Sequence, residues 1–153
     1  MSRSIFLFTL LITLLVTGCS SATREPLKTA LPPLESKWMI KMTHSGGIMG
    51  LMRSIEISSD GNYTVMDDRS NKAITKKLSA TELSKLQEIV SNAEYVNTER
   101  SGPSGCADCF IYDLEIEEGG KHFSIQVDDI SMPNSGMETL IAYLRALINA
   151  AVK

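Results

Sequence analysis

The sequence has few of the residues that usually carry nucleic-acid binding. Aromatic residues make up only 6% of its 153 residues, with a single tryptophan. Fifteen Lys and Arg residues against 18 Asp and Glu residues give a net charge of −3, and no basic block stands out. A nucleic-acid interface needs a basic face and aromatic stacking platforms. Nucleic acid is therefore not expected as a partner.

The common catalytic motifs are absent as well. The sequence contains no phosphate-binding loop, dinucleotide fingerprint, nucleophile elbow or two-histidine metalloprotease motif. Its two histidines, His44 and His122, have no serine or carboxylate neighbour at a catalytic spacing, so we expect ordinary strand residues there. Asp128 and Asp129 follow a strand-like segment and are expected to form a turn. The sequence predicts a protein that is not an enzyme, without metal or cofactor.

Long hydrophobic runs are limited to the N-terminus. The run from Ile5 to Val16 is shorter than the roughly 20 residues that cross a bilayer and, following Arg3, is typical of a signal peptide. Val16-Thr17-Gly18-Cys19 resembles the box at which bacterial lipoproteins are cleaved and lipidated. We therefore expect a signal peptide over residues 1–18 and acylation, palmitate included, at Cys19. The alternative is an ordinary secretory signal or a buried helix with an incidental cysteine.

A lipidated Cys19 would place the protein outside the cytoplasm. Two acyl chains hold a protein on a membrane without inserting it, and in a Gram-negative source that membrane would be the outer one. Residues 19–36 contain Pro26, Pro32 and Pro33 and show neither helical nor strand periodicity. We expect this segment to be a flexible tether between the lipid and the folded domain.

The folded domain is predicted over residues 37–153. Alternating apolar residues predict strands near residues 37–44, 51–58, 63–65, 110–117 and 123–127, with a weaker candidate at 72–78. Ser79-Ala80-Thr81-Glu82 and Ser135-Gly136-Met137-Glu138 each fit a capping box that opens an amphipathic helix. The expected fold is α+β, with an antiparallel sheet of four to five strands, two helices packed on one face, and the order β-β-β-α-β-β-α.

Cysteine is scarce, and two of the three cysteines lie close together. Cys106 and Cys109 are separated by two residues in a segment with Gly102, Pro103 and Gly105. The spacing is compatible with a structural disulfide, a redox-active dithiol or half of a metal site. We favour a disulfide because the expected compartment is oxidising and only two histidines remain as further soft ligands.

Four segments, in their order along the chain, resemble the emfourin family, small proteins that inhibit thermolysin-like zinc metallopeptidases such as protealysin. The segments are Ile40 to Arg53, Leu78 to Leu83, Ala107 to Leu114 and Leu140 to Leu144. The resemblance covers roughly residues 38–149. The lipoprotein signal and the Cys106/Cys109 pair look like departures from the plainest members. The resemblance implies a secreted or envelope metallopeptidase as partner.

A glycine-rich loop is the candidate contact with such a partner. It consists of Ser45, Gly46, Gly47, Ile48, Met49 and Gly50 and lies between two predicted strands. Its glycines permit close approach of the backbone to a peptidase, and Ile48 or Met49 could enter an apolar subsite. The alternative is that the glycines only shape a hairpin. Four methionines lie in or beside the loop: Met39, Met42, Met49 and Met52. Such a cluster can form an adaptable contact surface, but more often it belongs to the core.

Three function classes remain open from the sequence. The first is a membrane-tethered inhibitor or binder of a metallopeptidase, and the second is an envelope lipoprotein that binds another partner without inhibiting it. The third is a thiol redox protein that uses Cys106 and Cys109.

Overall fold

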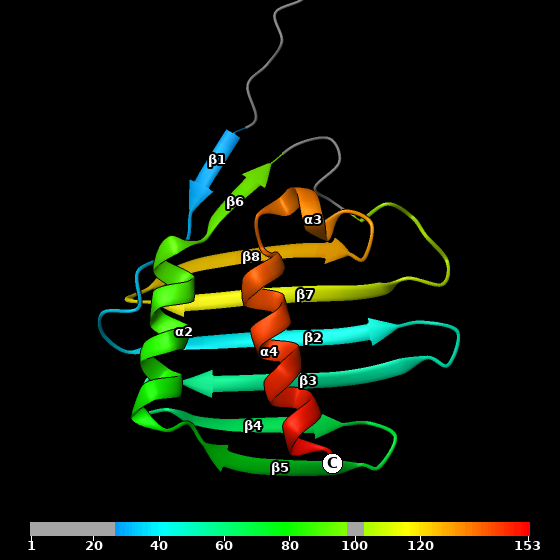
Figure 1. Ribbon diagram of the computed structural model, residues 1–153, viewed down its shortest axis with the longest axis horizontal. Helices are drawn as coiled ribbons and strands as arrows, with labels where there is room; N and C mark the ends of the chain where they lie inside the picture. Colours follow the sequence, from blue (N-terminus) through cyan, green and yellow to red (C-terminus); the bar gives the residue numbers. More distant parts are fainter. Residues whose placement is uncertain (1–26, 98–102) are drawn as a thin grey trace, which may run out of the picture.

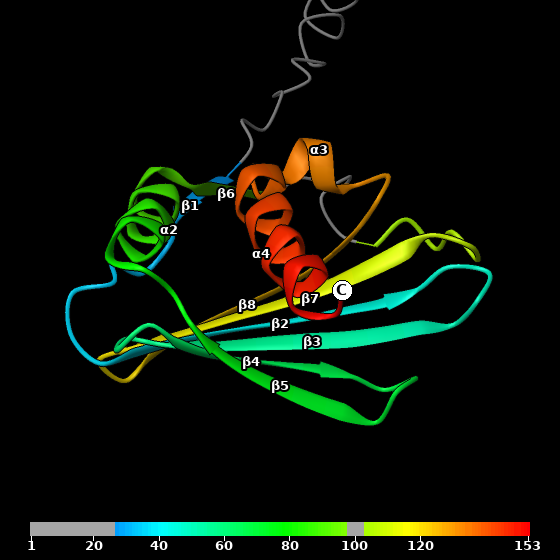
Figure 2. The ribbon, with the colours of Figure 1, turned by 60° about the horizontal axis from the view of Figure 1, so that its bottom comes forward.

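The computed structural model describes residues 27–97 and 103–153, which form an antiparallel sheet with helices on one face (Figures 1 and 2). The strand order is β5-β4-β3-β2-β7-β8. The six strands are β2 (Trp38–Gly46), β3 (Leu51–Ser58), β4 (Asn62–Asp67), β5 (Lys72–Lys77), β7 (Phe110–Glu118) and β8 (Lys121–Asp128). The predicted α+β class is therefore confirmed, with more strands in the sheet than the four to five expected.

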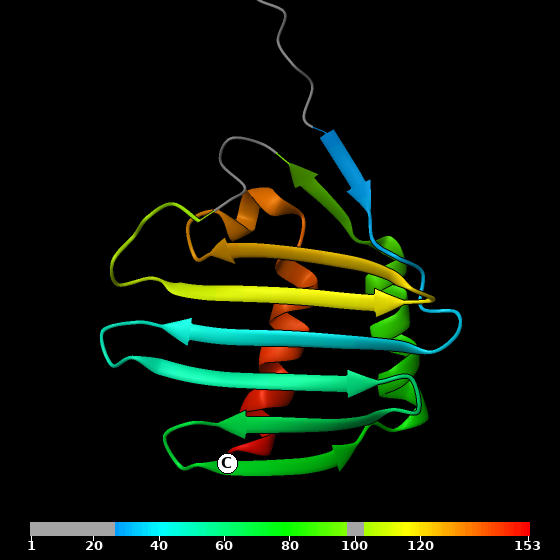
Figure 3. The same cartoon turned by 180° about the vertical axis from the view of Figure 1, so that it is seen from behind.

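Two helices cover one face of the sheet and leave the other face open (Figures 2 and 3). They are α2 (Ala80–Asn92) and α4 (Glu138–Ala151). In β2, Ile40 and Met42 are fully buried toward the helices, whereas Lys41 between them is exposed on the open face. Ile40 lies between Ile57 of β3 and Ile116 of β7. The alternating pattern of the sequence thus divides each strand between a core face and a polar face.

Helix α2 begins where the first capping box predicts. The Ser79 hydroxyl accepts a hydrogen bond from the Glu82 N–H, and the Glu82 carboxylate accepts one from the Ser79 N–H at 2.8 Å. Leu86 and Val90 are buried beneath the helix, and Leu83 packs partly against the same core. Reciprocal capping and an apolar stripe together fix this helix over the sheet.

The second predicted capping box is wrong. Ser135 ends a short helix, α3 (Met132–Ser135), and Gly136 adopts a left-handed φ of 75° immediately after it. Helix α4 begins at Glu138 without a side-chain cap. A Cβ at position 136 would lie 2.1 Å from the Glu94 carbonyl oxygen, so the glycine is required by a close backbone approach. The Ser-x-x-Glu spacing was therefore a coincidence here.

A second sheet differs from the prediction. Leu27–Ala30 forms β1 and Glu94–Asn97 forms β6, and the two pair in antiparallel fashion apart from the main sheet. The expected order β-β-β-α-β-β-α lacks β1 and β6, and it also lacks strand β5 and helix α3. Residues 27–31 also depart from the flexible tether expected for 19–36, since Leu31 is buried in the core. The predicted signal peptide, Cys19 and residues 20–26 lie outside the described residues.

Candidate functional site

Several chain segments converge at one end of the main sheet. The β2–β3 hairpin, the β4–β5 turn, the segment before β7 and the turn after β8 all lie there (Figure 3). We call this part of the molecule the loop end. Its most exposed large hydrophobic side chains, Ile48 and Met49, belong to the hairpin formed by Ser45, Gly46, Gly47, Ile48, Met49 and Gly50.

The hairpin presents two apolar side chains to solvent. Ser45 and Gly46 are the last residues of β2, and the turn is closed by a hydrogen bond from the Gly50 N–H to the Gly47 carbonyl at 2.9 Å. Ile48 is 86% exposed and Met49 is 75% exposed. Large exposed apolar side chains at a projecting turn are suited to protein contact.

The glycines at the base of the hairpin approach the chain's own backbone. Gly46 has a φ of 102°, and a Cβ there would lie 2.5 Å from the Cys109 carbonyl oxygen. Gly47 has a φ of 69°, and a Cβ there would lie 2.8 Å from a ring carbon of Phe110. These two glycines therefore make a close internal contact that no other residue type allows without movement.

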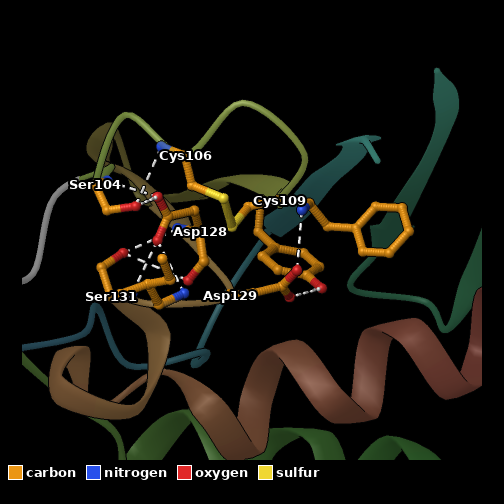
Figure 4. Close-up of a disulfide and its surroundings, with 9 residues drawn as sticks. Ser104, Cys106, Cys109, Asp128, Asp129 and Ser131 are labelled. Atoms are coloured by element: carbon orange, nitrogen blue, oxygen red, sulfur yellow. Dashed lines mark hydrogen bonds between the residues drawn. A yellow bond between two sulfur atoms is a disulfide. The ribbon is translucent and has the colours of Figure 1, made fainter. Parts of the chain in front are cut away.

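A disulfide joins Cys106 and Cys109 in the segment that Gly46 and Gly47 contact, with the two Cα atoms 5.5 Å apart (Figure 4). We call this stretch before β7, from Ser104 to Cys109, the disulfide segment. Neither cysteine is a thiolate available for metal binding or redox chemistry in this state. The Gly47 N–H donates to the Cys109 carbonyl at 3.2 Å. The disulfide thus lies directly behind the hairpin base.

Asp128 and Asp129 hold this segment in place, as Figure 4 shows. Asp128 accepts hydrogen bonds from the backbone and hydroxyl of Ser104 and from the backbone of Ser131. Burial raises the pKa of Asp128, but these hydrogen bonds outweigh it and lower the pKa to about 2. Asp129 accepts from the Phe110 N–H at 2.9 Å. The two carboxylates therefore lie at a turn, as predicted, and accept hydrogen bonds from protein donors.

A buried aromatic cluster lies beneath the hairpin. The His44 ring stacks on Tyr112 at a centroid distance of 4.9 Å and packs against Phe110. Burial and the Arg145 charge lower the pKa of His44 to about 4. Burial and a hydrogen bond to Asp129 raise the pKa of Tyr112 to about 12. His44 is thus a neutral packing residue at neutral pH.

The second histidine lies at the opposite end of the sheet. His122 is near the start of β8, with its side chain 56% exposed, and its Nδ1 is 3.8 Å from a carboxylate oxygen of Glu117. The two histidines are therefore separate strand residues, as expected. The methionines in and beside the hairpin also differ in burial. Met42 is buried in the core, whereas Met49 and Met52 are exposed.

Sequence reasoning missed Arg69. This residue lies in the β4–β5 turn, and its guanidinium donates to the Met49 carbonyl at 2.6 Å. A lone arginine in a turn carries no motif, and its partner lies 20 residues away in the chain. Only the antiparallel pairing of β3 with β4 brings them together.

A family model described as Emfourin matches residues 67–145, more than half of the chain. The chain belongs to the emfourin family. The matched range runs from the end of β4 into α4 and includes the disulfide segment, whereas the Ser45–Gly50 hairpin precedes it. None of the curated proteins matches the chain significantly.

This emfourin has no structural sign of a metal centre within the residues described. Over 27–97 and 103–153, no group of three or more potential His, Cys, Asp or Glu ligands is close enough to hold an ion. In the same two ranges, no helix has the length and apolar character needed to cross a membrane.

Proposed function

We propose that this emfourin is a protein inhibitor of thermolysin-like zinc metallopeptidases, held outside the cytoplasm by lipid at Cys19. Membership of the emfourin family is the observation that carries the proposal. An inhibitor needs no catalytic group of its own, so the role is not enzymatic. The lipoprotein box around Cys19 supports display in the cell envelope, where secreted peptidases are encountered.

The hairpin is the part of the surface best suited to enter a peptidase cleft. Ile48 and Met49 project at its tip. Its base is fixed by the Cys109 carbonyl, and its tip is held by the hydrogen bond from Arg69 to the Met49 carbonyl. A contact loop that is already ordered loses little conformational entropy on binding, which increases affinity. Ile48 or Met49 would fill an apolar subsite of the peptidase.

The inhibition constant against a panel of thermolysin-like peptidases tests this role. Ile48→Asp and Met49→Asp are expected to weaken inhibition by about a hundredfold, because each would bury a charge in an apolar subsite. Leu27→Asp is the matched control, since Leu27 is also exposed, at 67%, but lies on β1 outside the loop end. Thermal melts establish that each variant is folded.

Two results would exclude this assignment. Full-strength inhibition by folded Ile48→Asp and Met49→Asp would remove the hairpin from the interface. Absence of inhibition across the whole panel would favour the second candidate, an envelope lipoprotein that binds another partner. The lipoprotein box supports that candidate equally well.

The lipid anchor is tested separately from inhibition. In a bacterium that processes lipoproteins, Cys19→Ser is expected to lose acyl labelling and to leave the membrane fraction, because the modified thiol is absent. Cys106→Ser with Cys109→Ser retains Cys19 and should remain labelled. A Cys19→Ser protein that stays uncleaved in the membrane would show that residues 5–16 act as an anchor helix.

A further inference from the structure

The hairpin is fixed on one side by the disulfide segment. The Gly47 N–H donates to the Cys109 carbonyl, and Gly46 pairs with Phe110 in the β2–β7 register. The contact is so close that neither Gly46 nor Gly47 has room for a Cβ. Any movement of the Cys109 carbonyl would therefore be transmitted to the backbone immediately before Ile48.

The Cys109 carbonyl is itself well fixed. The disulfide joins it to Cys106, whose N–H donates to the Ser104 hydroxyl at 3.4 Å. The Ser104 hydroxyl donates a hydrogen bond to the Asp128 carboxylate. Phe110, which follows Cys109, donates from its N–H to the Asp129 carboxylate and accepts from the Asp129 N–H. A four-residue disulfide ring has few conformations, so its main effect is on the local shape of the loop.

Arg69 fixes the hairpin on the other side. Its guanidinium donates to the Met49 carbonyl, while its own N–H donates to a carboxylate oxygen of Asp67 at 3.1 Å. The other oxygen of Asp67 accepts from Arg53 on β3, also at 3.1 Å. The β4–β5 turn is therefore a second support, independent of the disulfide.

We propose that the Cys106–Cys109 ring and Arg69 clamp the hairpin so that a peptidase meets it as a ligand and does not cut it. Cleavage at Gly47–Ile48 would add water across the peptide bond and leave a carboxylate on Gly47 and an amine on Ile48. A peptidase must first draw several residues into an extended strand, and the clamp opposes that local opening. The identity of the peptidase rests on the proposed function; the clamp does not.

Limited proteolysis of the full chain by a thermolysin-like peptidase, with cut sites mapped by mass spectrometry, tests the clamp. The wild type should resist cutting at Gly47–Ile48 and Ile48–Met49. Cys106→Ser with Cys109→Ser should be cut there at least about tenfold faster, and Arg69→Ala about threefold faster, because each loses part of the support. Lys72→Ala is the matched control, since it removes a nearby cation without removing the Met49 contact.

A second measurement needs no peptidase activity on the hairpin. Amide hydrogen exchange at Gly47 should accelerate about tenfold in the double-serine variant. Leu86 and Val90, the buried residues of α2, should keep their protection, which would show that the fold is intact. Unchanged exchange at Gly47, or equal cutting of wild type and variants, would overturn the clamp. A wild type that inhibits no peptidase but shows these differences would overturn only the proposed function.

Discussion

The two glycine-containing hairpins at opposite ends of the sheet look alike in sequence but differ in what surrounds them. In the β2–β3 hairpin, Gly46 is pressed against the Cys109 carbonyl, and apolar side chains project from the tip. In the β7–β8 hairpin, Gly120 has a φ of 80° with nothing within 4 Å of a Cβ, and charged residues flank the turn. Glycine content alone therefore does not mark a contact site; the packing behind the glycine does.

The largest expected difference between the hairpins comes from adding a methyl group at their glycines. Gly46→Ala should lower the free energy of unfolding by about 4 kcal/mol, since it combines left-handed strain with a clash against backbone. Gly120→Ala should cost only the strain, about 1 to 2 kcal/mol. Denaturant unfolding measures both, and equal losses would mean that the close approach at Gly46 has no energetic weight.

The buried histidine beneath the β2–β3 hairpin provides the next test, through the dependence of stability on pH. The pKa of His44 is lowered to about 4, below its unfolded value of 6.5, so the unfolded chain binds the extra proton first. The contribution of His44 to stability is complete above pH 6.5 and is lost as the pH falls toward 4, by about 2 to 3 kcal/mol.

A variant at His44 separates this effect from the rest of the chain. His44→Phe should flatten the dependence of unfolding free energy on pH between 6.5 and 4, because the ring stays packed without titrating. A slope that persists in His44→Phe would assign the pH dependence to other groups.

The smallest expected difference lies at glycines that have open space in both hairpins. A Cβ at Gly50, with a φ of 57°, meets nothing within 4 Å, and one at Gly119, with a φ of 53°, meets only Ser36 Oγ at 4.0 Å. Gly50→Ala and Gly119→Ala should therefore each lower the free energy of unfolding by about 1 kcal/mol. The two losses should agree within the experimental error of denaturant unfolding. A large excess cost at Gly50 would reveal a contact beyond those described.

The same contrast explains which parts of the fold could be predicted. Five of the six strands of the main sheet carry alternating apolar residues, and α2 carries both its cap and its stripe, so local sequence determines these elements. Strand β5 is the exception, because only Ile74 in it is even partly buried. Strands β1 and β6 have four residues each, and all of β1 is exposed. They form because the two segments pair with each other, with Leu27 opposite Asn97, 70 residues apart in the chain. A local alternation of apolar residues cannot indicate such a long-range pairing.

The candidate site divides along the same line. Glycines around Ile48 and Met49, between two predicted strands, made the hairpin visible in the sequence. The Cys106/Cys109 spacing was compatible with a disulfide, which the expected oxidising compartment favoured. The contact between Gly47 and Cys109 and the bond from Arg69 to Met49 depend on tertiary structure. The contacts that hold the hairpin could therefore not be predicted from local sequence, whereas the apolar residues at its tip could.

Hydrogen–deuterium exchange of this emfourin, free and bound to a thermolysin-like peptidase, tests the central claim most directly. Binding should protect the amides of residues 45–50 and leave those of the Gly119–Gly120 turn unchanged, since the proposed peptidase contact is at the loop end. Protection centred on the β7–β8 hairpin, with residues 45–50 exchanging as in the free protein, would contradict it.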